Sequence, residues 1–141
     1  MLLIIKNILK YLNSNETIEN LAYCLTLALA FALIPFNGLF HPLLLLFLIL
    51  FNGNLLVFLF ATPFFKLLSP MVIVEFHKLG DQILTLSSLR SFFEFLSGIP
   101  LLIFSNWNNT VTMGGYIIFA ILGYPIFLIF KTITKNYRRK I

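Results

Sequence analysis

Few residues in this sequence have the side chains that catalysis or metal binding requires. Its 141 residues include two histidines, one cysteine and five carboxylates, and their positions do not match the ligand spacing of a zinc site. The sequence also contains no phosphate-binding loop, nucleophile elbow or pair of catalytic carboxylates. We therefore predict no catalytic residue, no metal site and no cofactor, and a protein that is not an enzyme.

Lys66 and His77 are the two ionisable residues closest to a functional pattern. Lys66 lies in an apolar run, residues 64–68, and an ionisable residue inside a membrane segment is a functional candidate. It either binds a phosphate or carboxylate, or extends its ammonium to the membrane surface by snorkelling. His77, between Glu75 and Lys78, is either an interfacial residue with one hydrogen bond or a catalytic base.

Polar and helix-breaking residues interrupt residues 50–70, LFNGNLLVFLFATPFFKLLSP. Asn52, Gly53 and Asn54 form a turn signal, and Pro63 removes a backbone hydrogen bond. Backbone groups freed at membrane depth must be satisfied by protein or by a wet cavity. Asn side chains can satisfy them, and Gly53 can adopt a positive φ. We predict a buried turn, and expect these four residues and Lys66 to contact a substrate or a partner.

The composition indicates lipid, rather than water, as the main solvent. Hydrophobic residues make up 60% of the chain and charged residues 11%, whereas soluble domains are about 25% charged. The net charge is +5, but half of the basic residues follow the last apolar run, which is typical of a cytoplasmic membrane end rather than of nucleic-acid binding. These residues are Lys131, Lys135, Arg138, Arg139 and Lys140. We predict an integral membrane protein with a single domain, residues 1–141.

Apolar runs and helix breakers divide this domain into helices, so the predicted fold class is all-α. Residues 17–34 and 111–130 are long enough for two full transmembrane helices. Residues 39–74 predict a re-entrant or broken helical hairpin, with two ordinary spans joined by a cytosolic turn as the alternative. Residues 2–13 and 79–97 have the amphipathic pattern of interfacial helices, with a cytosolic leader and a soluble loop helix as the respective alternatives.

Charge also predicts the topology. Lys6 and Lys10 precede the first crossing and the basic tail follows the last one, so both termini are expected in the cytoplasm of a multi-pass protein. Residues 75–110 then lie outside, and they carry three acidic and two basic residues. An outer segment that is not basic agrees with this orientation.

Asn108, Asn109 and Thr110 lie where the outer segment becomes the last crossing. Asn109 can cap a helix that begins at Thr110, which contributes about 1 kcal/mol. We also expect these three residues to contact the hairpin turn or a partner.

Three segments resemble a known family. PFNG at residues 35–38, the apolar stretch to Asn54 and the proline-punctuated arm that follows are similar to the bacterial membrane proteins called domain of unknown function 2062. FHKLG at residues 76–80 and NNTVTMG at residues 108–114 resemble segments of one branch of that family. The resemblance covers about residues 15–135 and implies a bacterial inner-membrane protein without an assigned activity. The wider family often has Asn-Pro where this chain has Thr62-Pro63.

Two functions agree with these features. The first is a small non-catalytic inner-membrane subunit that anchors or assembles with a larger envelope protein, since members of the closer branch look like partners of such a protein, with lipid transport as the process. The second is an oligomeric transporter of small molecules or lipids, since broken helices commonly form substrate sites. The expected partners are the bilayer, a larger envelope or membrane protein, and further copies of the chain; nucleic acid is not expected.

Overall fold

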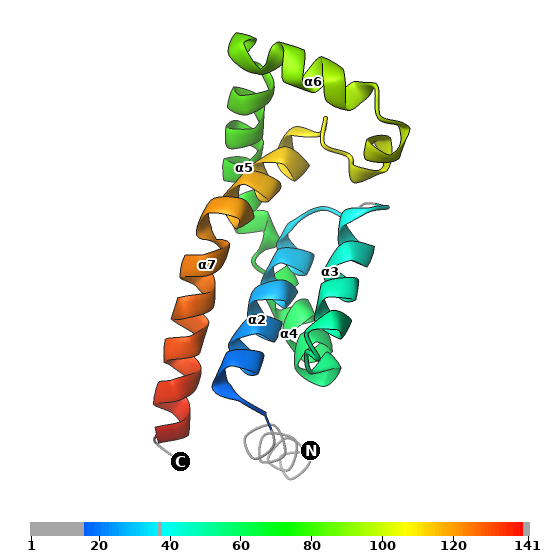
Figure 1. Ribbon diagram of the computed structural model, residues 1–141. Helices are drawn as coiled ribbons and strands as arrows, with labels where there is room; N and C mark the ends of the chain where they lie inside the picture. The colour runs from blue at the N-terminus through cyan, green and yellow to red at the C-terminus, as the bar shows by residue number, and fades with distance from the viewer. Residues whose placement is uncertain (1–15, 37, 140–141) are drawn as a thin grey trace.

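Helices make up all of the regular structure in residues 16–36 and 38–139, the parts of the chain that the computed structural model describes (Figure 1). The all-α fold class is confirmed for these residues, whereas the interfacial helix predicted for residues 2–13 lies outside them. The α-helices are α2 (Ile18–Leu33), α3 (Phe40–Leu50), α4 (Leu55–Lys66), α5 (Ser69–Leu84), α6 (Arg90–Ser97) and α7 (Thr110–Arg139). The two 3₁₀-helices are η1 (Ser87–Leu89) and η2 (Pro100–Ser105).

Helix α2 occupies the middle of the bundle (Figure 1). Helices α4 and α7 pack against it, α3 contacts it less extensively, and α5 packs on α7. The start of α2 and the end of α7 lie at the same end of the molecule, where Glu19 and Lys131 form an ion pair of 3.0 Å. We call this the terminal end, and the opposite end, where α5 leads into α6, the distal end.

Helix lengths support one membrane crossing directly. α7 has 30 residues, about 45 Å of helix, and is the one described helix that is both long and apolar enough to cross a membrane by itself. α2 has 16 residues, or about 24 Å, which is less than a hydrocarbon core of about 30 Å. α4 and α5 reach the required length only together, and they are bent by 78° at their junction.

The predicted hairpin is present as two helices joined by a turn, but its end differs from the prediction. The second arm was expected to continue towards residue 74, whereas α4 ends at Lys66. Pro70 does not close the hairpin. It lies in the first turn of α5, where its missing N–H would have no partner within the helix.

The single amphipathic helix predicted for residues 79–97 is wrong. α5 continues to Leu84, the backbone is extended at Leu86, and α6 begins only at Arg90. The Thr85 hydroxyl donates a 2.7 Å hydrogen bond to the Asp81 carbonyl, and two serines follow. Residues of this kind bind nearby backbone groups and are weak helix formers, so the helix ends there.

Two apolar clusters hold the bundle together. One joins α2 to α3 and α4, and the other joins the end of α2 to α5 and α7. The first contains Cys24, Ala28, Leu48, Val57 and Phe58, and the second contains Leu33, Ile34 and Phe76.

Candidate functional site

The turn between α3 and α4 packs on the first turns of α2. Asn54 Oδ1 accepts hydrogen bonds from the backbone N–H groups of Leu56 and Val57, at 3.0 and 3.2 Å, and so caps α4. The Asn54 backbone N–H donates to Cys24 Sγ at 3.1 Å, and its Nδ2 donates to Glu16 Oε1 at 2.9 Å. Other parts of the protein, at the terminal end, therefore satisfy the polar groups of Asn54.

Asn52 and Gly53 have different roles from those expected. Positive φ was predicted at Gly53, but it occurs at Asn52, whose φ is 51° and whose carbonyl accepts a 3.0 Å hydrogen bond from Asn20 Nδ2. Asn is one of the few residues that tolerate this conformation. Gly53 is required for space instead, because a Cβ atom there would lie 2.9 Å from the Leu48 carbonyl oxygen.

Lys66 caps the opposite end of α2. Its Nζ donates a 3.0 Å hydrogen bond to the Ala32 carbonyl. The last carbonyls of a helix lack partners within it, and a positive charge is favourable there. Lys66 thus has a role in holding the fold that neither of its two expected roles included.

His41 also binds the end of α2, a role that was not predicted from the sequence. Its Nε2 donates a 3.1 Å hydrogen bond to the Phe31 carbonyl, and the side chain is buried. The signal that could have found it is its position, three residues after a helix-ending PFNG segment and directly before a proline. A polar side chain there can hydrogen-bond the last carbonyls of the preceding helix, which have no partner within that helix.

His77 lies where α5 crosses α7. Its Nδ1 forms a 2.5 Å hydrogen bond with the Thr110 hydroxyl. A Cβ atom on Gly80 of α5 would overlap the Thr110 carbonyl, and one on Gly114 of α7 would overlap the Phe76 carbonyl. The two helices therefore touch backbone to backbone, which small residues allow, and this contact joins the FHKLG and NNTVTMG segments.

Asn109 caps α7, as predicted from the sequence. Its Oδ1 accepts a 3.1 Å hydrogen bond from the Thr112 backbone N–H, and Asn108 beside it is exposed. The expected contact of these residues with the hairpin turn is wrong, because they lie at the distal end whereas Asn54 binds the start of α2. The cause is the length of α2, about 24 Å, which separates the two places.

The predicted site residues therefore do not form one site. Asn52, Gly53 and Asn54 lie at the terminal end of α2, and Lys66 at its other end. His77 and the Asn108–Thr110 segment lie at the α5–α7 crossing, and Pro63 is exposed on α4. Within residues 16–36 and 38–139, no three His, Cys, Asp or Glu side chains are grouped closely enough to hold a metal ion.

An apolar groove that sequence reasoning missed lies between α2, α3, η2 and α7. Its volume is about 600 Å³. It is lined by Thr26, Leu27, Ala30, Leu39, Phe40, Leu43, Leu44, Leu102, Ser105, Tyr116, Phe119, Ala120 and Gly123. The groove left no signal in the sequence, because apolar residues that line a cavity look the same as those that fill a core.

Charged side chains occur at two levels along the bundle. At the terminal end, Glu19 pairs with Lys131, and Arg138 donates to the Glu16 carbonyl. On α5, Lys78 pairs with Glu75 at 2.8 Å. Between these levels the described side chains are uncharged apart from Lys66, near the last turn of α2.

Comparisons with known proteins give no match: no family model, no curated protein and no solved structure is similar to the chain. The family resemblance of the three sequence segments therefore stays a prediction.

Proposed function

We propose that this protein is a small non-catalytic membrane subunit that assembles with a larger envelope protein, in the inner membrane of a bacterium. The observation that carries this proposal is a pair of exposed phenylalanines on α6, at the distal end. Two features support it: the position of the bilayer on the bundle, and the position of α6 relative to that bilayer.

The two charged levels mark the edges of the bilayer. From the Glu19–Lys131 pair to the Gly115–Ile34 contact near the distal level, α7 has 16 residues, or about 24 Å of helix. An apolar layer of this depth is somewhat thinner than an average hydrocarbon core, and long Lys and Arg side chains reach the interface from within it. In this placement both α2 and α7 cross the layer and the protein is multi-pass.

The basic residues at the end of α7 give the orientation. Lys135 and Arg139 are exposed at the terminal end, and an excess of Lys and Arg favours the cytoplasmic side. The start of α2 and the end of α7 lie on this cytoplasmic side, so both termini of the chain are cytoplasmic in this placement. The turn between α3 and α4 lies at the same level. This position favours hairpin arms that cross the apolar layer, rather than a turn that is buried at the centre of the layer.

The residues that follow α5 begin beyond the distal charged level, and η2 returns to this level, where it packs beside the start of α7. We call residues 85–109, with η1, α6 and η2, the outer cap (Figure 1). Trp107 stacks on Phe93, with ring centroids 5.5 Å apart and planes within 10°, so the cap has a small apolar centre of its own. Phe92 and Phe95 point elsewhere and are 54% and 67% exposed.

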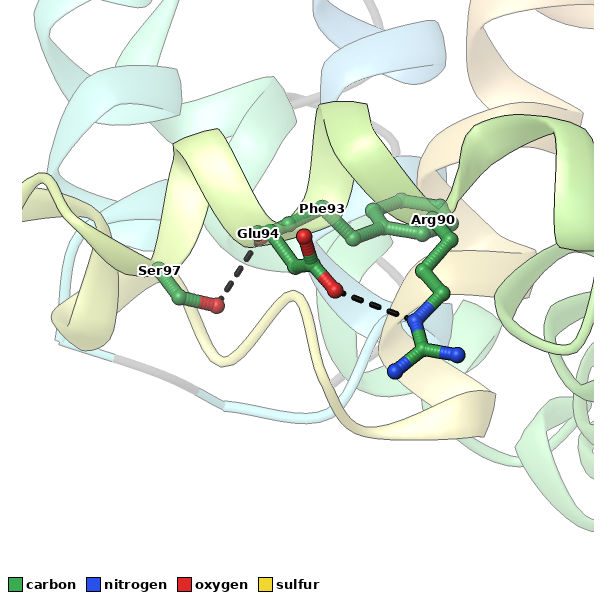
Figure 2. A network of polar contacts seen from close by, with 4 residues as sticks. All are labelled: Arg90, Phe93, Glu94 and Ser97. Atoms are coloured by element: carbon green, nitrogen blue, oxygen red, sulfur yellow. Dashed lines mark hydrogen bonds and ion pairs between the residues drawn. The ribbon is translucent and has the colours of Figure 1, made fainter.

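Polar groups on α6 lie on the other face of the helix, beside Phe93, and not around the two exposed rings (Figure 2). Arg90 Nε and Glu94 Oε1 are 3.0 Å apart, and the Ser97 hydroxyl donates to the Phe93 carbonyl at 2.9 Å (Figure 2). A hollow of about 410 Å³ lies beside them, between α6 and the end of α5. Exposed aromatic rings are enriched at protein–protein interfaces, which supports a partner that docks on the outer cap.

Purification of the tagged chain from native membranes tests the proposal. We expect one larger protein to copurify in a fixed ratio, and to be lost in the double variant Phe92→Ser with Phe95→Ser. Ser91→Ala, an exposed position on the same helix, is the matched control and should retain the partner. A wild-type chain that purifies without any other protein would contradict the proposal.

An oligomeric transporter is the second candidate, and the 78° bend between α4 and α5 favours it. Broken helices of this kind commonly form substrate sites in transporters. A homo-oligomer that purifies alone, and that resists the Phe92 and Phe95 substitutions, would support this function over the first.

A further inference from the structure

We propose that the apolar groove between α2, α3, η2 and α7 binds one acyl chain of a bilayer phospholipid. This inference rests on the membrane placement proposed above but not on the proposed partner. It assigns a lipid-binding site to residues that show no functional signal in the sequence.

The groove lies where hydrocarbon surrounds the protein. Along α7 it extends from Tyr116 to Gly123, which is about 10 Å of helix inside the layer between the two charged levels. Leu102 and Ser105 of η2 border it near the distal end, whereas Thr26 lies near the middle of α2. A chain from the distal leaflet can therefore enter beside η2 and extend towards the middle of the bilayer.

The lining leaves no polar group for a headgroup to bind. Each of its three hydroxyls already donates to a backbone carbonyl: Thr26 to Ala22 at 2.8 Å, Ser105 to Leu102 at 2.7 Å, and Tyr116 to Ser105. The other lining residues are apolar and none is charged. Because a polar ligand would lose its own hydrogen bonds here, the occupant is a hydrocarbon chain, and about 600 Å³ is within the range of ligand pockets.

Gly123 gives the groove its depth. A Cβ atom at Gly123 would meet no atom within 4 Å, whereas Gly114 and Gly115 on the same helix lie against other helices. A glycine within a helix costs about 1 kcal/mol relative to alanine, and close helix packing does not explain this one. The absence of a side chain instead keeps the wall of the groove open.

Photo-crosslinking tests this site. The chain is reconstituted in phosphatidylcholine vesicles in which a fraction of the lipid carries a diazirine near the end of one acyl chain, and adducts are mapped by peptide mass spectrometry. We expect a high ratio of adducts on Leu44 and Phe119, which line the groove, to adducts on Leu122, which is exposed on α7 at the same depth and does not line the groove.

A Cβ atom at position 123 has open space around it, so Gly123→Leu should extend into the groove, and the gain in helix propensity favours folding. It should lower the adduct ratio about tenfold, the loss expected when two buried CH₂ groups are displaced. Ala120→Leu, in the same wall, should lower it as well. Ile121→Phe enlarges an exposed side chain outside the lining and should leave the ratio unchanged.

Two outcomes would overturn the proposal. An adduct ratio near one in the wild type, or one that Gly123→Leu leaves unchanged, would show that the groove holds lipid no better than the rest of the surface. Adducts on neither the groove nor Leu122 would overturn the membrane placement together with the site. The absence of a larger partner in the purification would change neither the adduct ratio of the wild type nor the effect of Gly123→Leu on that ratio.

Discussion

Gly80 and Gly114 face one another where α5 crosses α7, and neither position has room for a methyl group. A Cβ atom on Gly80 would meet the Thr110 carbonyl and the Gly114 nitrogen, and one on Gly114 would meet the Phe76 carbonyl. The obstacles are backbone atoms, which cannot rotate away as a side chain can. This contact fixes α5, and with it the outer cap, onto α7, the one described helix that is long and apolar enough to cross a membrane by itself.

Gly80→Ala and Gly114→Ala are therefore expected to separate the two helices. Overpacking of this kind costs about 1–3 kcal/mol, and thermal unfolding of the detergent-solubilised protein measures the loss. Gly123→Ala on α7 is the matched control, because its new methyl group meets open space, and it should be neutral or slightly stabilising. Equal stability of all three variants would refute the close crossing.

Asn54→Ala should destabilise the hairpin turn. The variant loses the cap on α4 and the hydrogen bond to Glu16, and the loss of an N-cap alone costs about 1 kcal/mol. Asn54→Ser keeps a capping oxygen and should recover most of that stability. Chemical denaturation in mixed micelles can rank the three proteins, and an Ala variant as stable as wild type would contradict the capping role.

Lys66→Met separates a structural role of this lysine from a ligand-binding role. Removing the cation from the last turn of α2 should lower stability by up to about 1 kcal/mol, while Lys66→Arg preserves a donor for the Ala32 carbonyl. The thermal unfolding temperature of each variant is the measurement. If Lys66→Met leaves the unfolding temperature unchanged but abolishes function in cells, a role in ligand binding would replace the one described here.

Asn109 and its neighbour Asn108 form a natural comparison. Asn109→Ala removes the oxygen that accepts the Thr112 N–H and should cost about 1 kcal/mol. Asn108→Ala changes an exposed side chain and is expected to be within experimental error of wild type. Greater destabilisation by Asn108→Ala than by Asn109→Ala would require a different start of α7.

Single cysteines on a Cys24→Ala background test the orientation. In intact cells an impermeant thiol reagent should label Ser91→Cys, in the outer cap, but not Lys135→Cys at the terminal end. Phe51→Cys, an exposed position beside the hairpin turn, should behave as Lys135→Cys does. Labelling of Phe51→Cys from outside would restore a re-entrant hairpin that turns before it reaches the cytoplasmic side.

Local signals in the sequence predicted the elements better than their contacts. The prediction of a helix over residues 17–34 agrees with α2 to within one residue at each end, because Thr17 and Pro35 are strong local signals. The same is true of the Asn109 cap. The break between α5 and α6 was missed, since Thr85 and two serines interrupt an apolar pattern that otherwise continues, and helix propensity is a weak guide when tertiary contacts compete.

The candidate site was less predictable, because its residues act through distant partners. The importance of Lys66 was recognised, but its partner, the Ala32 carbonyl, is 34 residues away and carries no sequence signal. Gly114 and Gly123 have the same local context of an apolar helix, yet one packs against α5 and the other opens into a groove. Only the three-dimensional arrangement of the helices distinguishes them.

Polar groups of α2 have their hydrogen-bond partners later in the chain. This arrangement has a consequence for when the contacts of α2 can form during synthesis. Cys24 and Ala32 find their partners at Asn54 and Lys66, 30 and 34 residues later in the chain. While the ribosome is still translating α3, the Ala32 carbonyl near the end of α2 lacks its Lys66 donor, whereas Thr17 already caps the start of the helix. Because α7 also packs on α2 and its Lys131 pairs with Glu19, the contacts of α2 become complete only when the last helix has been made.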